Sequence, residues 1–489
     1  MSMGIVGRQS IYNTLSIGFA FIIGAINMLI LYPSFPGKEF QGLIVALLAN
    51  SNLLQPFISF GVQHTLIKFF SSSKNKSEKD RLLWFVLLLP IIVLIILIPF
   101  YIYFDFEIIN FLSNGNEGVT HFTFLIIAIA ISTAYFEIFF SWLRVHFKSV
   151  FGNFLKEVYP RLLTFLLLIL YAFGIISLDS FVNYLILGYY LRLIIVMGYS
   201  FKIYIPSFEF FLPKSWRQML RYSFLIFLSG ASASLILDID KSMIFSLISE
   251  ENVAFYAVAL YITAVIEAPG RAMFQITSPM VAKALNENDK LNLEKLLKKS
   301  SLNLMIVSGI IFLIINLNLI DFYKILNKEG YASAIGVVVI VSIGKFFSMS
   351  MGCLNNIISN SKYYIYVFWF SVSSAILAII LNFILIKSYG IIGASIATLI
   401  VIIFINSCKI LLVYFLYKIH PYSLKTMEVF ISLVVIYGLI YLIPSFQSSW
   451  ISIFIRTALI LFLFSIPFFS FGWSKDIIDV INNIRRKLF

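Results

Sequence analysis

About fourteen apolar runs, each long enough to cross a bilayer, alternate with short polar connections along this 489-residue chain. Only 12% of the residues are charged and 60% are hydrophobic, whereas soluble domains have about 25% charged residues. Backbone groups in lipid must be satisfied inside helices or closed barrels, and the alternating pattern of a barrel strand is absent. We therefore predict an all-α polytopic membrane protein.

The predicted spans follow one another closely. They run near residues 11–32, 40–70, 82–104, 120–145, 155–178, 180–203, 219–247, 253–283, 301–326, 331–359, 363–387, 390–417, 426–445 and 450–472. The longest polar connections, at 71–81, 205–218 and 286–300, are short and basic. No connection is long enough to fold as a soluble domain, so we expect the protein to act within the membrane.

Lysine and arginine concentrate in alternate connections, which predicts the orientation. The connections expected inside hold Lys74, Lys76, Lys79, Arg81, Arg144, Lys148, Lys202, Lys214, Arg217, Lys290, Lys295, Lys298, Lys299, Lys418, Lys425, Arg485, Arg486 and Lys487. The outer connections hold Lys38, Lys324, Lys328 and Lys387. We predict a multi-pass protein of the cytoplasmic membrane with both termini in the cytoplasm. The net charge of +13 then reflects orientation and not nucleic-acid binding.

Motifs of enzymatic or metal chemistry are absent from the sequence. The two cysteines, Cys353 and Cys408, lie in apolar segments without a C-x-x-C pattern, and there are only four histidines. No nucleophile triad, phosphate loop or zinc motif is present. We predict no catalytic residue, no metal site and no cofactor. A membrane glycosyltransferase or polymerase is an alternative, but such enzymes usually carry a sizeable outer loop or an acidic outer pair.

Matching features recur at a nearly constant offset. Arg221 lies 213 residues after Arg8, Pro269 213 after Pro56, Asp321 216 after Asp105 and Gly390 216 after Gly174. We predict two six-helix repeats of the same orientation. The predicted domains are an N-terminal lobe at 1–204, a cytoplasmic linker at 205–218, a C-terminal lobe at 219–418, and two extra helices with a basic tail at 419–489.

Two segments of the second half carry a resemblance to a known family. They are Gly330-Tyr-Ala-Ser-Ala334 and the run from Asn382 to Thr398, which contains Gly390-Ile-Ile-Gly393. With the repeat and the two extra helices, the chain resembles the multidrug/oligosaccharidyl-lipid/polysaccharide flippase superfamily, and within it the polysaccharide (O-antigen, Wzx-type) flippases. The resemblance implies a fold like that of the superfamily's multidrug exporters.

The resemblance also implies a function. It implies alternating-access translocation of polyprenyl-pyrophosphate-linked oligosaccharide repeat units across the cytoplasmic membrane, for O-antigen, lipopolysaccharide or other surface polysaccharide. The expected partners are this lipid-linked oligosaccharide and membrane lipids. Other polysaccharide assembly proteins, and a coupling ion (H⁺ or Na⁺), are left open.

A cation-coupled drug or metabolite exporter on the same fold is the alternative transporter. Such exporters often use an acidic residue in the first helix, and the run 11–32 contains neither Asp nor Glu. The intramembrane cations favour an anionic substrate instead.

Glu267 and Arg271 lie four residues apart in the predicted eighth helix, around Pro269-Gly270. One interpretation is an ion pair along the helix. In the other, Arg271 lines the cavity and holds phosphate, and the Pro-Gly pair bends the helix as a hinge. Pro56, at the matching place in the second helix, is a second candidate hinge.

Lys345 and Arg192 lie near the middle of their predicted helices with no acidic residue at helical spacing. Their partners must come from other helices or from substrate, and Arg192 can also be a structural tie. We predict that Arg271 and Lys345 together contact the pyrophosphate. Arg456 is expected to snorkel to the outer surface.

Asp238, Asp240 and Lys241 lie in the outer part of the predicted seventh helix. The two carboxylates point about 200° apart on a helix, so a shared metal site is not expected. Asp238 can pair with Lys241 three residues on, or these residues can contact a sugar or an ion in the cavity.

Polar residues are unusually frequent in the second predicted helix. Asn52, Gln55 and Gln63 fall near one face, where they can contact sugar hydroxyls or make interhelical hydrogen bonds. His64 is expected to be a packed residue. Lys156, Glu157 and Arg161 are attributed to orientation, because they lie near cytoplasmic ends.

Overall fold

The computed structural model describes residues 16–70, 73, 75–103, 123–146, 148–208, 211–444, 446–474 and 477–478. Arg8 and Asp105 of the predicted repeat, and the basic tail at 485–487, lie outside these residues. The described chain is helical, and its elements belong to two compact units, Met1–Ala257 and Val258–Phe489. The division falls inside α13 (Glu250–Thr263).

Within the described residues, twelve helices are long and apolar enough to cross a membrane. The 53-residue α18 (Ile365–Tyr417) contains a kink at Gly390 and so covers two predicted spans. The predicted fifth span consists of two short helices, α9 (Ser149–Glu157) and α10 (Tyr159–Ala172). Neither is long enough by itself to cross a membrane, so this span is not among the twelve. With one more span from each of these places, the all-α prediction of about fourteen helices is confirmed.

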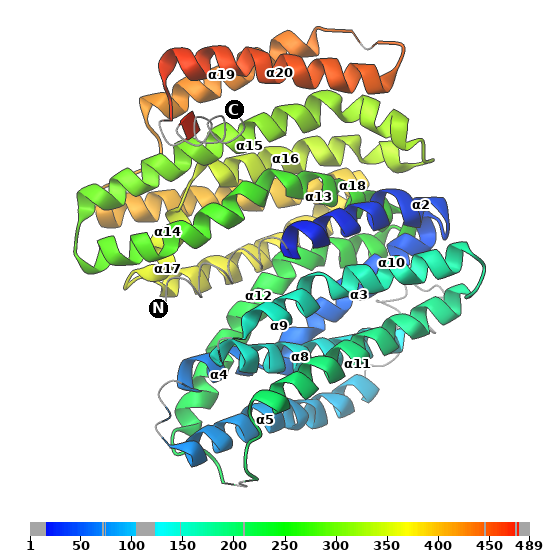
Figure 1. The fold of residues 1–489 in the computed structure, drawn as a ribbon, viewed down its shortest axis with the longest axis vertical. Helices are drawn as coiled ribbons and strands as arrows, with labels where there is room; N and C mark the ends of the chain where they lie inside the picture. Colours follow the sequence, from blue (N-terminus) through cyan, green and yellow to red (C-terminus); the bar gives the residue numbers. More distant parts are fainter. Residues whose placement is uncertain are drawn as a thin grey trace, which may run out of the picture. The chain divides into compact units, whose positions relative to one another are not determined.

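The first unit contains the helices of the first 250 residues (Figure 1). They are α2 (Tyr32–Ser34), which follows a π-helical turn at Asn27–Leu31, then α3 (Lys38–Ser59), α4 (Val62–Phe70), α5 (Lys76–Tyr103), α8 (Thr123–Val145), α9, α10, α11 (Leu178–Ile203) and α12 (Trp216–Leu247). Helix α8 packs between α3 and α11. Its buried Trp142 lies in an apolar core with Leu66, Val86 and Val196.

The second unit contains the remaining helices (Figure 1). They are a 3-10 turn at Ala264–Glu267, α14 (Ala268–Asn286), α15 (Lys290–Leu326), a 3-10 turn at Tyr331–Ala334, α16 (Ile335–Ser350), α17 (Leu354–Asn360), α18, α19 (Leu424–Tyr441) and α20 (Ser449–Phe471). The last two helices pack on each other and on α15. Leu313, Val429 and Ile460 are buried in the core between them.

Helix α12 belongs to the first compact unit, because it packs against α3 and α4. The approach is close at Gly61, where an added Cβ would lie 2.6 Å from the Ser223 carbonyl oxygen. The compact units therefore do not divide at the predicted linker, 205–218. The two six-helix repeats, with their lobes at 1–204 and 219–418, stay a prediction from the sequence.

The small residues around Gly390 have a direct structural reason. Gly390 has φ 58° and ψ −139°, a region that residues with a Cβ essentially do not adopt. Three residues later, an added Cβ on Gly393 would lie 1.9 Å from the Leu385 carbonyl oxygen. The segment thus joins two helices through a sharp kink with backbones in close contact.

Candidate functional site

A polar cavity of about 610 Å³ lies within the first unit, lined by residues of α3, α4, α8, α9, α10, α11 and α12. Its size is in the range of small-molecule sites, roughly 300–1,000 Å³. Three acidic and three basic residues line it: Glu137, Glu157, Asp238, Lys156, Arg161 and Arg192. Because charged groups at membrane depth usually serve a function, these six residues make the cavity the candidate functional site.

One wall of the cavity is formed by the interrupted second span. Helix α3 ends at Ser59, Phe60 and Gly61 have φ of 47° and 73°, and α4 begins at Val62. Gly61 lines the cavity directly. Non-helical backbone at membrane depth is tolerated where it is buried in protein or lines a water-filled space. The break therefore suits a wall that water and substrate can reach.

The polar residues of this span lie at the cavity. Asn52, Gln55 and the candidate hinge Pro56 line it from α3, and Gln63 and His64 from α4. Gln55 also donates to the Ser59 hydroxyl at 3.2 Å. Pro56 lies one turn before the break, where its ring removes a helical hydrogen bond. The predicted face of Asn52, Gln55 and Gln63 is thus a cavity wall, and His64 belongs to it as well.

Four charged residues at the cavity form two ion pairs. Lys156 Nζ lies 2.7 Å from Glu137 Oε1, and Arg161 Nη1 lies 3.1 Å from Glu157 Oε2. The sequence attributes Lys156, Glu157 and Arg161 mostly to orientation. The break between α9 and α10, where Pro160 follows, brings them to the cavity instead. The spacing of Glu157, Pro160 and Arg161 was the sequence signal for this arrangement.

Arg192 differs from the other cations of the cavity. It is only 4% exposed, and its guanidinium lies between two rings, 4.2 Å from the Phe136 centroid and 4.6 Å from that of Tyr189. Its Nη2 donates to the Thr133 hydroxyl at 3.4 Å. Among the described residues no carboxylate pairs with it, and its Nε has no hydrogen-bond partner. Arginine has five N–H donors, so most of this group's binding capacity is unused.

The two carboxylates of the Asp-x-Asp stretch of α12 lie in different surroundings. Asp238 lines the cavity and pairs with Lys241 at 2.5 Å, which is the predicted local pair. Asp240 is 5% exposed and accepts from the Tyr256 hydroxyl at 2.6 Å. The carboxylates do not converge, and the described residues contain no group of three or more metal-ligating side chains. Of this stretch, only Asp238 reaches the cavity wall.

In the second unit, Glu267 has a partner that the helical spacing did not indicate. Its Oε2 lies 3.1 Å from Lys345 Nζ of α16. Arg271 is exposed, and the described residues include no ion pair with it. The proposed pairing of Glu267 with Arg271 was therefore wrong. Glu267 is the last residue of the 3-10 turn at Ala264–Glu267, whereas Arg271 lies in the first turn of α14.

The second candidate hinge coincides with this interruption. Pro269 lies at the start of α14, immediately after the 3-10 turn, where a missing N–H is tolerated. An added Cβ on Gly270 would lie 2.5 Å from Met349 Sδ. Pro269 also borders a mainly apolar cavity of about 530 Å³ between α14 and α15. Its lining carries far less charge than the cavity of the first unit, which we therefore take as the candidate site.

Removing the carboxylate of Glu267 is expected to destabilise the second unit. In Glu267→Gln, Lys345 keeps its charge at membrane depth without its partner, which should lower stability by about 1–2 kcal/mol, since Glu267 is partly exposed. Adding Lys345→Met should restore most of the loss. The measurement is the thermal midpoint of the purified protein. Arg271→Gln is the matched control and should leave the midpoint unchanged; an equal drop in both single variants would contradict the assigned pair.

Comparison with known proteins identifies relatives of the chain. A family model described as "Polysaccharide biosynthesis protein" matches residues 6–283. The "Uncharacterized membrane protein MJ1375" of Methanocaldococcus jannaschii is 25% identical over 416 residues, which cover 80% of this chain and 94% of that protein.

Solved structures share the fold. The "Lipid II flippase MurJ" in an inward closed conformation matches with a TM-score of 0.76 and 17% identity, over 96% of this chain and 100% of that one. An inward-facing "multidrug resistance MATE family transporter of the MOP superfamily" matches with a TM-score of 0.61 and 13% identity, over 84% and 96%. Identities this low establish the common fold only.

Proposed function

This chain belongs to the polysaccharide biosynthesis protein family, and we propose that it is a flippase of the multidrug/oligosaccharidyl-lipid/polysaccharide superfamily that acts on a lipid-linked oligosaccharide. In this proposal it moves polyprenyl-pyrophosphate-linked repeat units from the cytoplasmic to the outer leaflet of the cytoplasmic membrane. The observation that supports it most is the buried cation Arg192, whose donors are largely unused at a polar cavity.

The charge balance of the cavity favours an anionic substrate. Glu137 and Glu157 are each neutralised by a cation of the lining, and Asp238 by the neighbouring Lys241. Arg192 is the cation of the lining that makes no ion pair with a carboxylate among the described residues. A desolvated cation attracts an anion strongly, and the planar fork of arginine suits phosphate oxygens. A pyrophosphate would supply the missing charge.

The remaining walls suit sugars. Asn52, Gln55 and Gln63 offer amide donors and acceptors from the interrupted second span, and amides of this kind can bind sugar hydroxyls. Arg271 is exposed in the second unit, and its contact with phosphate stays a prediction from the sequence. Lys345 is a weaker candidate than the sequence suggested, because Glu267 already neutralises it.

Alternating access requires helices that can bend. The breaks beside Pro56 and beside Pro269-Gly270 are proposed as the two hinges, since each interrupts a span with glycine or non-helical backbone. Lys241 and Asp240 then act in positioning Asp238: the lysine by its ion pair, the aspartate by anchoring the helix to Tyr256.

A cation-coupled exporter is the second candidate, because three carboxylates line the cavity. Each of them, however, has a cation within ion-pair distance. An organic cation would have to displace one of these partners and would also be repelled by Arg192. The observed pairing therefore supports the flippase proposal over the exporter.

Deletion of the gene in its native host tests the proposal. We expect lipid-linked repeat units to accumulate on the cytoplasmic face and surface polysaccharide to be lost, with both restored by the wild-type gene. The measurements are mass spectrometry of extracted lipid-linked sugars and immunoblotting of surface polysaccharide. If the polysaccharide persists while resistance to cationic drugs falls, the exporter function is correct and the flippase proposal fails.

A further inference from the structure

The first residues of the connection between α11 and α12, Tyr204 and Ser207, are hydrogen-bonded to α5. The carboxylate of Asp80, which is fully buried, accepts from the Tyr204 hydroxyl at 2.5 Å and from the Ser207 N–H at 3.1 Å. Trp84 Nε1 donates to the Ser207 carbonyl at 2.9 Å. Burial and the bond to Asp80 raise the pKa of Tyr204 to about 12, so the phenol stays protonated as the donor. Tyr204 and Ser207 are thus anchored to α5.

Although its backbone is anchored, this connection exposes large apolar side chains. Phe208 and Phe211 are 70% and 72% exposed. The Phe208 ring meets the edge of Trp84 with the centroids 5.2 Å apart. Of this aromatic cluster, Trp84 is of the residue type that is enriched in the headgroup region of a bilayer, and the exposed Phe208 ring packs against it. The surface is therefore suited to lipid.

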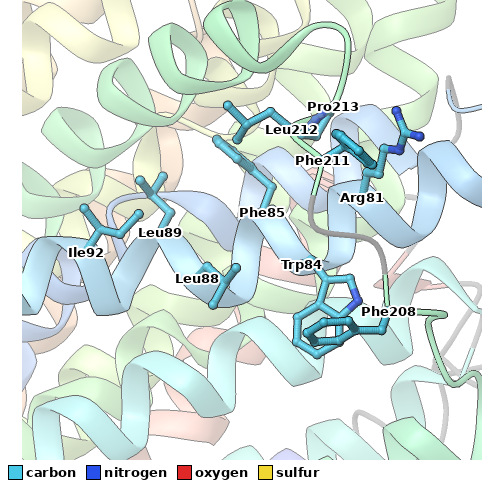
Figure 2. Close-up of a pocket in the computed structure, with 10 residues that line it drawn as sticks. All are labelled: Arg81, Trp84, Phe85, Leu88, Leu89, Ile92, Phe208, Phe211, Leu212 and Pro213. Carbon is cyan, nitrogen blue, oxygen red and sulfur yellow. The ribbon is translucent and has the colours of Figure 1, made fainter.

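A narrow pocket of about 160 Å³ lies between the connection and α5. Figure 2 shows Arg81 at one end and Ile92 at the other, with Phe85 and Leu89 between them and Phe211 and Leu212 on the side of the connection. The guanidinium of Arg81 lies 5.3 Å from the Phe211 centroid. The pocket thus has a cationic end at Arg81 and an apolar strip formed by Phe85, Leu88, Leu89 and Ile92. An amphiphile has the complementary pattern, an anionic head and an apolar chain.

The length of the pocket matches one leaflet. Arg81 and Ile92 are separated by about 16 Å along α5 at 1.5 Å per residue. Half of the hydrocarbon core of a bilayer is about 15 Å thick. The span predicted for α5 begins at residue 82, just after Arg81, on the side that the charge bias predicts to be cytoplasmic. A lipid of that leaflet would therefore have its phosphate at Arg81 and its chain along the apolar strip.

The surrounding charge selects an anionic lipid. The segments 76–81 and 202–221 together contain seven lysines and arginines against three acidic residues. Of the acids, Asp80 is buried and already accepts two hydrogen bonds. Lys202, Lys214 and Arg217 are exposed. Basic residues near a membrane surface each favour anionic lipid by about 1 kcal/mol.

We propose that the pocket between α5 and the α11–α12 connection binds one anionic phospholipid of the adjacent leaflet, with its phosphate at Arg81. The site shares no residue with the charged cavity and does not depend on the flippase function. Its ligand is an ordinary membrane phospholipid, so occupancy of the site beside the α11–α12 connection depends on the anionic lipid content of the leaflet.

The test uses the full chain purified in detergent and titrated with phosphatidylglycerol or phosphatidylcholine, with bound lipid counted by native mass spectrometry. We expect the first lipid to bind with a preference for phosphatidylglycerol. Arg81→Gln should reduce that preference about fivefold, which corresponds to one basic residue. Leu88→Trp, which fills the apolar strip, should weaken both lipids equally.

Lys387→Gln is the matched control, because Lys387 also lies over a phenylalanine ring, at 3.9 Å from the Phe383 centroid, on the side predicted to be outer. It should leave the preference unchanged. The absence of a preference in the wild type, or an equal loss in Lys387→Gln, would overturn the proposal. So would displacement of the lipid by inorganic phosphate, which would indicate a free-anion site, or by polyglutamate, which would indicate an acidic protein partner.

Discussion

Arg192→Ala is expected to abolish transport while the protein still reaches the membrane at its normal level. Truncating one member of a buried, hydrogen-bonded charge pair costs about 2–5 kcal/mol, which is at least roughly thirtyfold in affinity. The folded protein should tolerate the change, because Arg192 has no carboxylate among the described residues that its loss would leave unpaired. Arg192→Lys should keep part of the activity, since it retains the charge without the planar fork.

The readout is complementation of the deletion strain, scored by surface polysaccharide, with the membrane level of each variant measured by immunoblotting. Arg144→Ala is the control: Arg144 lies in the same unit over the Phe140 ring, is exposed, and does not line the cavity. It should complement fully. Full complementation by Arg192→Ala, or a loss of activity that merely follows a loss of protein, would assign Arg192 a structural role.

Asp321→Asn is expected to cause the largest loss of stability. Arg456 Nη1 of α20 lies 2.9 Å from Asp321 Oδ2 of α15, and the two side chains are only 12% and 1% exposed. Arg456 also donates to the Leu317 and Ile443 carbonyls, at 3.2 and 3.0 Å. Removing the carboxylate leaves a buried cation unpaired, which should lower the free energy of unfolding by about 3 kcal/mol.

A double variant and a control separate this pair from general effects. Asp321→Leu with Arg456→Met removes both charges and should recover most of the stability, as for other buried pairs that are replaced by apolar residues. Lys324→Gln should change stability by less than about 1 kcal/mol, because Lys324 is 3.8 Å from Asp321 and mostly exposed. The thermal midpoint in detergent measures all three. Equal losses in Asp321→Asn and Lys324→Gln would contradict the assigned pair.

The pair also corrects the sequence interpretation of Arg456. Its position near a helix end suggested snorkelling to the surface, whereas the structure has it bound to α15. Helical spacing identifies partners on the same helix only. The partners of Arg456 and Lys345 come from helices distant in sequence. Helical spacing along one helix could therefore identify neither the Lys345–Glu267 pair nor the Arg456–Asp321 pair.

The sequence by itself determined the class of the protein and the path of its chain. Apolar runs of about twenty residues admit only transmembrane helices, because lipid satisfies no backbone hydrogen bond. The two predicted runs 363–387 and 390–417 also placed a break in the chain near Gly390, where the structure has its kink. The shared face of Asn52 and Gln55 followed from helical periodicity, which is a local property, whereas Gln63 reaches the same cavity across the break at Phe60-Gly61.

Only the tertiary structure decided which charges are neutralised and which are not. Asp238 and Lys241 could be paired from their spacing, but Lys345 and Arg456 find carboxylates on other helices, while Arg192 lies between two rings with none among the described residues. Likewise, Lys156 and Arg161 reach the cavity because the chain breaks between α9 and α10. Charge pairing in a bundle depends on how helices distant in sequence are packed, and hydropathy and spacing along one helix carry no information about that packing.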